Sequence, residues 1–356
     1  MRPAWRLFCG DVADEGVVVG RVPPYDAYRD VLVGIMAYVG PSVDLSRMAR
    51  VCRYWSRIAG RIMRDRDLII VADGSTNGAM RVYDVVLRRW SDLPAHPSTQ
   101  CVVLLNNRLV AIGIGTISEL VDGQWRPLAA CSALDRFSMA CILDGDLVVV
   151  CGYEKGQTIV MLRETRSGEW RELTRLRQHV CLASVGVIVR DQHRVLLLVG
   201  GDDDGRLVDL SLTLDPSDGS WRCLPRPPLG PHFPDGFTVW RNQLVIAGGW
   251  SRVLREKRTR RCSTFDIDDL TWRSLTPLPE NHVVAGLTVA GDNLIALVDD
   301  ADESGAAVRL VQYVESKWVP MASMDVVGMR RSTPGKDVPG RAWTVLGTRA
   351  SDWSPK

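Results

Sequence analysis

The chain has 356 residues, of which 46% are hydrophobic and 24% charged, the balance of an ordinary globular protein. Its formal net charge of +2 is too near neutral to make nucleic acid the expected partner. No apolar run reaches the roughly 18 residues that a membrane span needs, and the first residues do not have the pattern of a signal peptide.

Residues 1–20 carry no pattern that indicates a role, whereas residues 21–66 have a helical texture. The first predicted helix, which Gly40-Pro41 ends, has apolar residues at helical spacing: Val31, Leu32, Ile35, Met36 and Val39. A second predicted helix carries an apolar stripe made of Leu45, Met48, Cys52, Trp55, Ala59 and Ile62. A segment this short cannot bury much of a core alone, so the stripe is expected to pack on the rest of the chain or on a partner.

From residue 67 onward, one motif recurs six times. It is Trp-x-x-Leu, with Met closing the last copy, and successive tryptophans are 35 to 51 residues apart. The six tryptophans are Trp90, Trp125, Trp170, Trp221, Trp272 and Trp318. Unequal spacing around one period is typical of repeated structural units that carry loop insertions.

Each motif follows a short apolar run that tends to end in glycine: residues 68–74, 108–113, 146–152, 195–201, 243–249 and 293–300. Runs of this length that are rich in Val, Leu and Ile predict strands buried on both faces. A further short apolar run precedes most of them, and Asn106-Asn107, Asp144-Gly145 and Gly291-Asp292 between such runs predict tight hairpins.

An apolar residue followed by Asp marks a third strand and its turn, as in Tyr83-Asp84, Leu214-Asp215 and Phe265-Asp266, and the Trp then begins a fourth strand. Each unit is therefore a four-stranded antiparallel meander, and six such units predict an all-β, six-bladed β-propeller over residues 67–350. The first unit lacks its innermost strand. The C-terminal run at 341–347 is expected to supply it, with 326–329 as the alternative.

The apolar run, the glycine pair, the spaced aromatic residue and Trp-x-x-Leu together resemble the kelch repeat. The resemblance covers about residues 67–347 and is fullest at Gly200-Gly201 and Gly248-Gly249. The other units replace the glycine pair, as Asp299-Asp300 does in the sixth.

Residues 21–66 resemble a divergent F-box. Val22-Pro23 stands where the family opens with Leu-Pro, and Val51-Cys52-Arg53-x-Trp55 matches the family's Val-Cys-Arg-x-Trp helix. Pro24-Tyr25 replaces most of the family's acidic pair.

In the F-box family the helical unit docks on the Skp adaptor of a Skp–cullin–F-box ubiquitin ligase. The resemblance implies docking through Pro23, Leu32, Val51, Cys52 and Trp55. The alternative is that these helices only pack on one another. The order of F-box then kelch is similar to the plant kelch-repeat F-box proteins.

Other residue clusters do not indicate a metal, a cofactor or a catalytic centre. The acidic runs at 202–205 and 299–303 lack the alternation of a calcium loop, and the five histidines have no nucleophile or carboxylate partner in sequence. Some kelch propellers are copper oxidases, but no ligand motif of that class is present. The nine cysteines form no C-x-x-C pair, so they are expected to be buried small residues in a reducing compartment, the cytoplasm or the nucleus.

Strands alternate in direction within a meander, so the loops after the second and fourth strands emerge on one face of the ring, where a target protein is expected to bind. The candidate residues on this rim are Arg136, Tyr153, Arg175, Asp203, His232, Arg252, Arg255, Arg258 and His282.

The sequence thus favours a non-catalytic substrate-recognition subunit of a Skp–cullin–F-box ligase, with a Skp-family adaptor, a cullin and a target protein as partners. The alternatives are a kelch interaction scaffold whose helices cap the propeller, and a propeller enzyme.

Overall fold

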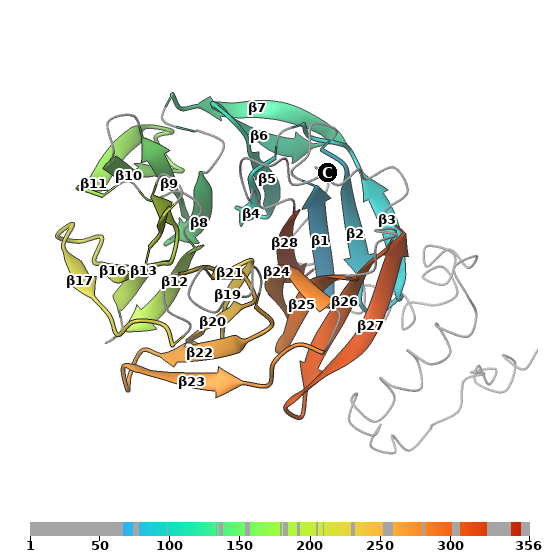
Figure 1. The fold of residues 1–356 in the computed structure, drawn as a ribbon. Helices are drawn as coiled ribbons and strands as arrows, with labels where there is room; N and C mark the ends of the chain where they lie inside the picture. The colour runs from blue at the N-terminus through green and yellow to red at the C-terminus, as the bar shows by residue number, and fades with distance from the viewer. Residues whose placement is uncertain are drawn as a thin grey trace, which may run out of the picture.

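The computed structural model describes residues 67–349, apart from the gaps that follow. The gaps are 74–77, 98, 133, 135–137, 154–156, 179, 181–183, 191–192, 204–205, 209, 229–231, 252–258, 280–281, 301–306 and 326–342. Within these ranges all regular structure is β: six four-stranded antiparallel sheets stand around a common axis as the blades of a propeller (Figure 1). The predicted fold class is therefore confirmed for the repeat region. The predicted helical segment at 21–66 lies outside the described residues.

The strands of the first three blades follow one another from the axis outward. Blade one has β28 (Trp343–Arg349), β1 (Asp67–Asp73), β2 (Met80–Asp84) and β3 (Arg89–Leu93). Blade two has β4 (Cys101–Leu105), β5 (Arg108–Ile112), β6 (Thr116–Val121) and β7 (Gln124–Ala130). Blade three has β8 (Met139–Leu143), β9 (Asp146–Tyr153), β10 (Gln157–Arg163) and β11 (Trp170–Leu176).

The remaining blades have the same order. Blade four has β12 (Ser184–Arg190), β13 (His193–Val199), β16 (Ser211–Leu214) and β17 (Trp221–Cys223). Blade five has β19 (Gly236–Trp240), β20 (Gln243–Ala247), β22 (Cys262–Asp266) and β23 (Thr271–Leu275). Blade six has β24 (His282–Ala290), β25 (Asn293–Asp300), β26 (Ala307–Val314) and β27 (Lys317–Asp325).

The ring closes through the C-terminal strand, as the run at 341–347 predicts. β28 pairs antiparallel with β1 from Asp67↔Arg349 to Asp73↔Trp343, so blade one combines strands from both ends of the repeat region. Gly347 lies against β24 of blade six, where its amide donates to the Thr288 hydroxyl at 2.6 Å. A Cβ at position 347 would overlap the Val289 carbonyl, so the close approach of the two inner strands requires glycine.

Six hydrophobic clusters form the core, and each lies between two adjacent blades. The Trp-x-x-Leu motif explains why, because residues three apart in a strand point to opposite faces. In blade five, Trp272 packs with Phe265 and Leu244 on the side of blade four, whereas Leu275 packs on the side of blade six. The other five motifs are divided in the same way, so each copy joins its own blade to both neighbours.

Four of the six indoles also make a hydrogen bond to the preceding blade. The indole Nε1 donates to a main-chain carbonyl just beyond that blade's motif, at 2.8–3.0 Å. The pairs are Trp90 with Ser323, Trp125 with Pro94, Trp272 with Pro225 and Trp318 with Thr276. The indole nitrogens of Trp170 and Trp221 are buried and have no hydrogen-bond partner in the described part of the chain.

The two faces of the ring carry different connections. One, which we call the hairpin face, carries the tight turns between first and second strands and between third and fourth strands. Asn106 and Asn107 have φ of 48° and 62°, as the predicted two-residue hairpin requires. The opposite face, which we call the rim, carries the connections from second to third strand and from one blade to the next.

Candidate interaction surface

The backbone of the rim is tied down by recurring hydrogen bonds. In several blades, the chain turns back after the fourth strand and forms hydrogen bonds with the beginning of the third strand of the same blade. In blade three, the Thr158 hydroxyl accepts from the Val180 amide at 2.7 Å and donates to the Gln178 carbonyl at 3.0 Å. In blade one, the His96 amide donates to the Gly78 carbonyl at 2.8 Å. The rim loops therefore extend from an ordered frame, the arrangement on which binding residues are usually carried.

The side chains that turn inward from these returning segments are buried. His96 is 7% exposed, Val180 2% and Leu278 1%. The His96 imidazole bonds to the Thr99 hydroxyl at 2.9 Å and meets the Trp125 ring edge-on, with centroids 4.9 Å apart. Burial lowers the pKa of His96 below its ordinary value, so this histidine is a neutral part of the frame.

The structure places the backbone of four predicted rim residues at this face. Tyr153 ends β9 opposite Gln157, and His282 begins β24 opposite Asp300. Asp203 and His232 lie in short extra strands described below. The predicted positions Arg136, Arg252, Arg255 and Arg258, and the adaptor-docking positions Pro23, Leu32, Val51, Cys52 and Trp55, lie outside the described residues.

Arg175 is the predicted rim residue whose side chain the structure describes. It lies near the rim end of β11, opposite Ile159. Its guanidinium donates twice to the Glu172 carboxylate, at 2.6 and 2.7 Å, and this interaction lowers the Glu172 pKa. A partner that uses Arg175 must therefore compete with, or bind beside, a two-point ion pair on the protein surface.

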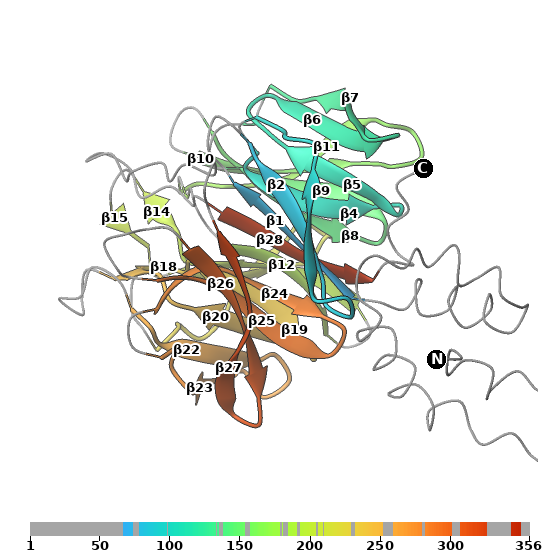
Figure 2. The same cartoon turned by 90° about the vertical axis from the view of Figure 1, so that its right-hand side faces the viewer.

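Two short two-stranded ladders, which the sequence did not predict, extend the rim at blades four and five. β14 (Asp202–Asp203) pairs with β15 (Arg206–Leu207), and β18 (His232–Phe233) pairs with β21 (Trp250–Ser251). Figure 2 shows β14, β15 and β18 on the same side of the ring. The acidic run that includes β14 indicated only a solvated loop, and residues 202–207, Asp-Asp-Asp-Gly-Arg-Leu, have no alternating pattern that would have predicted the ladder.

The chain enters the propeller on the face opposite to the rim. Asp67 begins β1 and pairs with Arg349, the last residue of β28, at the hairpin face. The first described residue of the propeller therefore lies at the end of the blades away from the rim loops.

The described residues contain no group of three or more His, Cys, Asp or Glu that could hold a metal ion, and no helix that could cross a membrane. Of the described cysteines, Cys101, Cys131 and Cys262 are buried, and Cys223 is exposed. Burial raises the pKa of Cys262 to about 12, so its thiol is unreactive at neutral pH.

Together these features define a six-bladed β-propeller whose organisation is compatible with the kelch type and with binding a protein target. The match to a solved structure titled "Structure of YjhT" has 15% sequence identity and a TM-score of 0.51, covering 64% of this chain and 84% of that one. The match to a chain of the "Crystal structure of Nidogen/Laminin Complex" has 11% identity and a TM-score of 0.54, covering 80% and 99%. No protein-family model and no curated protein sequence matches the chain. At these identities the likeness concerns the fold.

Proposed function

We propose that the chain is a substrate-recognition subunit of a Skp–cullin–F-box ubiquitin ligase, active in the cytoplasm or nucleus and not itself an enzyme. The observation that carries the proposal is the pairing of Val51-Cys52-Arg53-x-Trp55 with a complete propeller. Residues 21–66 bind the Skp-family adaptor, and the adaptor connects the protein to a cullin. The rim binds the target protein that is to be ubiquitinated.

The geometry of the ring supports this division of labour. The propeller joins the preceding segment at Asp67 on the hairpin face, whereas the rim loops lie at the other end of the blades. A receptor must hold its target without blocking the adaptor, and attachment at opposite faces meets that requirement. One of the matched chains belongs to a solved protein–protein complex, that of nidogen with laminin. This match is consistent with a protein-binding role for the propeller.

The adaptor role is tested by purifying the full-length chain with a Skp adaptor. The double variant Cys52→Asp, Trp55→Asp places two charges in the predicted apolar stripe and should abolish co-purification. The matched control, Arg50→Gln with Arg57→Gln, changes two residues of the same predicted helix that lie outside the apolar stripe, and this variant should still co-purify with the adaptor. Equal recovery of the wild type and the stripe variant, or no recovery of either, would overturn the ligase role.

The rim is tested separately with the adaptor left intact. Replacing Arg252, Arg255 and Arg258 by Ser should reduce ubiquitination of a captured target in a reconstituted reaction. The control replaces Arg88, Arg126 and Arg171 by Ser, because Arg88 lies in the turn between β2 and β3, and Arg126 and Arg171 lie near the hairpin-face ends of β7 and β11. A loss of equal size in both triple variants would show that the rim arginines have no specific role.

The second candidate is a kelch interaction scaffold in which residues 21–66 cap the propeller. The replacement of the family's acidic pair by Pro24-Tyr25 favours it. Deletion of residues 1–64 separates the two: under the scaffold role the propeller loses stability, whereas under the ligase role it remains folded with its melting temperature unchanged.

A further inference from the structure

The rim of blade two exposes an apolar side chain in the middle of a short turn. Ile114 lies in the three-residue connection from β5 to β6 and is 51% exposed. In the described part of the chain, the other exposed large apolar side chains lie in or near the turns of the hairpin face. They are Leu87, Val189, Leu270, Val314 and Val319. Among the described rim residues, Ile114 is therefore the one large apolar side chain that solvent reaches to this extent.

Main-chain hydrogen bonds join this turn to the rim connections on both sides of it. The Gln100 amide, at the end of the connection from blade one, donates to the Ile112 carbonyl at 2.7 Å. The Gly115 amide donates to the Leu134 carbonyl at 3.1 Å, and the Gly115 carbonyl accepts from the Cys131 amide at 3.4 Å. Both of these bonds reach the connection from blade two to blade three. The three segments therefore form one continuous and ordered part of the rim.

These three segments contain no Asp, Glu, Lys or Arg, at residues 94–100, 113–116 and 128–134. Their exposed residues, where the structure describes them, are small, apolar or hydroxyl-bearing. We call these residues the uncharged sector: Ala95, Pro97, Ile114, Thr116, Ala130 and Ser132. His96 and Leu134, from the same segments, are buried. The sector thus combines an exposed apolar side chain with neighbours that bring no charge to it.

The rim of the later blades has a different surface chemistry. Its sequence includes the acidic run at 202–204 in blade four, the basic run at 252–261 in blade five and the acidic run at 299–303 in blade six. Blade five lies across the ring axis from blade two (Figure 1). The rim is therefore divided into a charged part and an uncharged part.

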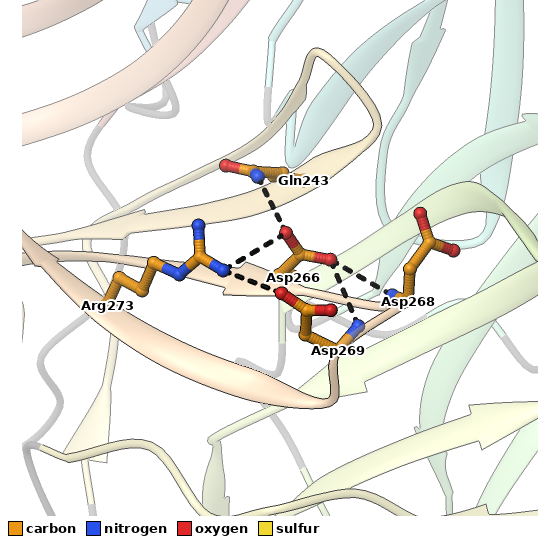
Figure 3. A network of polar contacts seen from close by, with 5 residues as sticks. All are labelled: Gln243, Asp266, Asp268, Asp269 and Arg273. Atoms are coloured by element: carbon orange, nitrogen blue, oxygen red, sulfur yellow. Dashed lines mark hydrogen bonds and ion pairs between the residues drawn. The ribbon is translucent and has the colours of Figure 1, made fainter.

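The hairpin face also carries charges, and the chain itself supplies partners for them. In the turn of blade five between β22 and β23, Arg273 pairs with Asp269 at 2.7 Å, and Gln243 donates to the Asp266 carboxylate at 3.1 Å (Figure 3). The uncharged sector offers no such counter-charge. A charged side chain of another protein that covered it would lose its water without gaining an ion pair, which is unfavourable.

We propose that the uncharged sector binds an apolar, uncharged segment of the target protein, with Ile114 at the centre of the contact. Covering Ile114 removes apolar surface from water, which favours binding. The main-chain hydrogen bonds hold its turn in place beforehand, so little ordering is required when the target binds. The inference rests on the proposed function only in taking the ligand of the rim to be a protein.

The two parts of the rim then have different tasks. The basic run of blade five attracts acidic groups over a distance, which mainly affects the rate of association and makes it depend on salt. The uncharged sector acts only at contact, through apolar surface, so its contribution lies in how long the complex lasts. Binding to this sector should therefore change little when the salt concentration is raised.

The test is selection of peptides from a displayed random library on the immobilised full-length protein, followed by anisotropy measurements with single labelled peptides. We expect enrichment of peptides that contain an apolar run without Asp, Glu, Lys or Arg. Ile114→Asp should weaken the binding of an enriched peptide by about tenfold or more, the effect of altering a central interface side chain. Ile114→Lys should weaken it to a similar extent, because either charge would be buried without a partner.

The matched control is Leu87→Asp. Leu87 is also an apolar turn residue, 39% exposed, but it lies between β2 and β3 on the hairpin face. This variant should bind the enriched peptides with the affinity of the wild type. All three substitutions are at exposed positions, and an unchanged melting temperature would show that each variant is folded.

Three outcomes would overturn the inference. The first is that no peptide is enriched. The second is that the enriched peptides are acidic and bind Ile114→Asp as tightly as the wild type, which would assign peptide binding to the basic run. The third is that Ile114→Asp and Ile114→Lys change the affinity in opposite directions, which would show that charge and not apolar burial governs the contact.

These outcomes can be distinguished from a failure of the ligase role. A chain that binds no Skp adaptor but enriches uncharged peptides loses the ligase role and retains the inference. A chain that binds the adaptor but enriches no peptide retains the ligase role and loses the inference.

Discussion

The six interfaces between blades contain the same tryptophan motif but differ in whether the indole is hydrogen-bonded. Where the preceding blade's fourth strand is regular, as in blades one, four and five, the indole donates to the carbonyl directly after the leucine. Where that strand has a bulge at the leucine or methionine, as in blades two, three and six, only Trp90 finds an acceptor, two residues farther along at Ser323. Trp170 and Trp221 face the bulged strands of blades two and three and find none.

Each motif tryptophan can have two roles, apolar packing and hydrogen bonding. All six tryptophans pack on the preceding blade, so apolar packing is the property that the repeat retains. The hydrogen bond is an addition that depends on the local path of a neighbouring backbone. A buried N–H without a partner carries a desolvation cost, so the interfaces of blades two with three and three with four should be the less stable ones.

The largest expected effect is that of removing a bonded indole altogether. Trp272→Ala deletes the contacts with Phe265 and the hydrogen bond to Pro225, and we expect it to lower the free energy of unfolding by about 3–5 kcal/mol. Trp221→Ala should cost less, because its indole nitrogen has no bond to lose. Denaturant unfolding measures both variants. A change within about 0.5 kcal/mol for Trp272→Ala would mean that the motif does not hold blades together.

Two glycines test whether the closing interface is as rigid as its geometry indicates. A Cβ at Gly347 would meet the Val289 backbone, whereas one at Gly186 would lie 2.8 Å from ring carbons of Phe237, a side chain that can rotate. Gly347→Ala should therefore lower stability by about 3 kcal/mol, the upper end for overpacking, and Gly186→Ala by about 1 kcal/mol. The reverse order in thermal unfolding would show that the β24–β28 contact can shift.

Replacing indole by phenyl isolates the hydrogen bond from the packing. Trp272→Phe leaves the Pro225 carbonyl without its donor, whereas Trp221→Phe removes a buried donor that had no acceptor. We expect Trp272→Phe to be more destabilising than Trp221→Phe by about 1–2 kcal/mol. Equal losses would contradict the distinction between the two kinds of interface.

The pH dependence of stability tests the indole interface between blades one and two, where His96 meets Trp125. Burial lowers the His96 pKa in the folded state, so the unfolded chain takes up this proton at a higher pH. Stability should be complete above about pH 6.5 and fall on acidification until the folded pKa is reached, by at most about 1.4 kcal/mol per pH unit. His96→Gln should remove this component of the pH dependence. An unchanged slope in His96→Gln would assign the effect to other groups.

Much of the propeller could be predicted because its repeats use strong local signals. Trp272 and Leu275 are separated by an odd spacing that sends them to opposite faces, and Asn106-Asn107 adopts the left-handed backbone of a tight hairpin. The closing strand could also be anticipated, because a blade that begins at residue 67 lacks an inner strand. The β14–β15 and β18–β21 ladders escaped prediction because each pairs only two residues per strand, too few for a periodic pattern.

The candidate sites were less predictable for a related reason. The connectivity of the meander places the rim loops on one face, but it does not specify that Arg175 binds Glu172. The turns between the third and fourth strands of blades four and five have equal length, yet Asp218 accepts from the Ser220 amide, whereas its counterpart Asp269 pairs with Arg273. Whether an aspartate bonds to its own turn or to an arginine depends on hydrogen bonds within about 3 Å, which residue types alone do not determine.

Closure by β28 also governs the order in which the protein can be completed during synthesis. Blade one is the first blade to leave the ribosome, yet its inner position is filled only when residues 343–349 have been made. Until then β1 presents an open edge of apolar residues, the kind of edge that other nascent chains can pair with. The last few residues of the repeat region therefore decide when the newly made chain ceases to be vulnerable to misassembly.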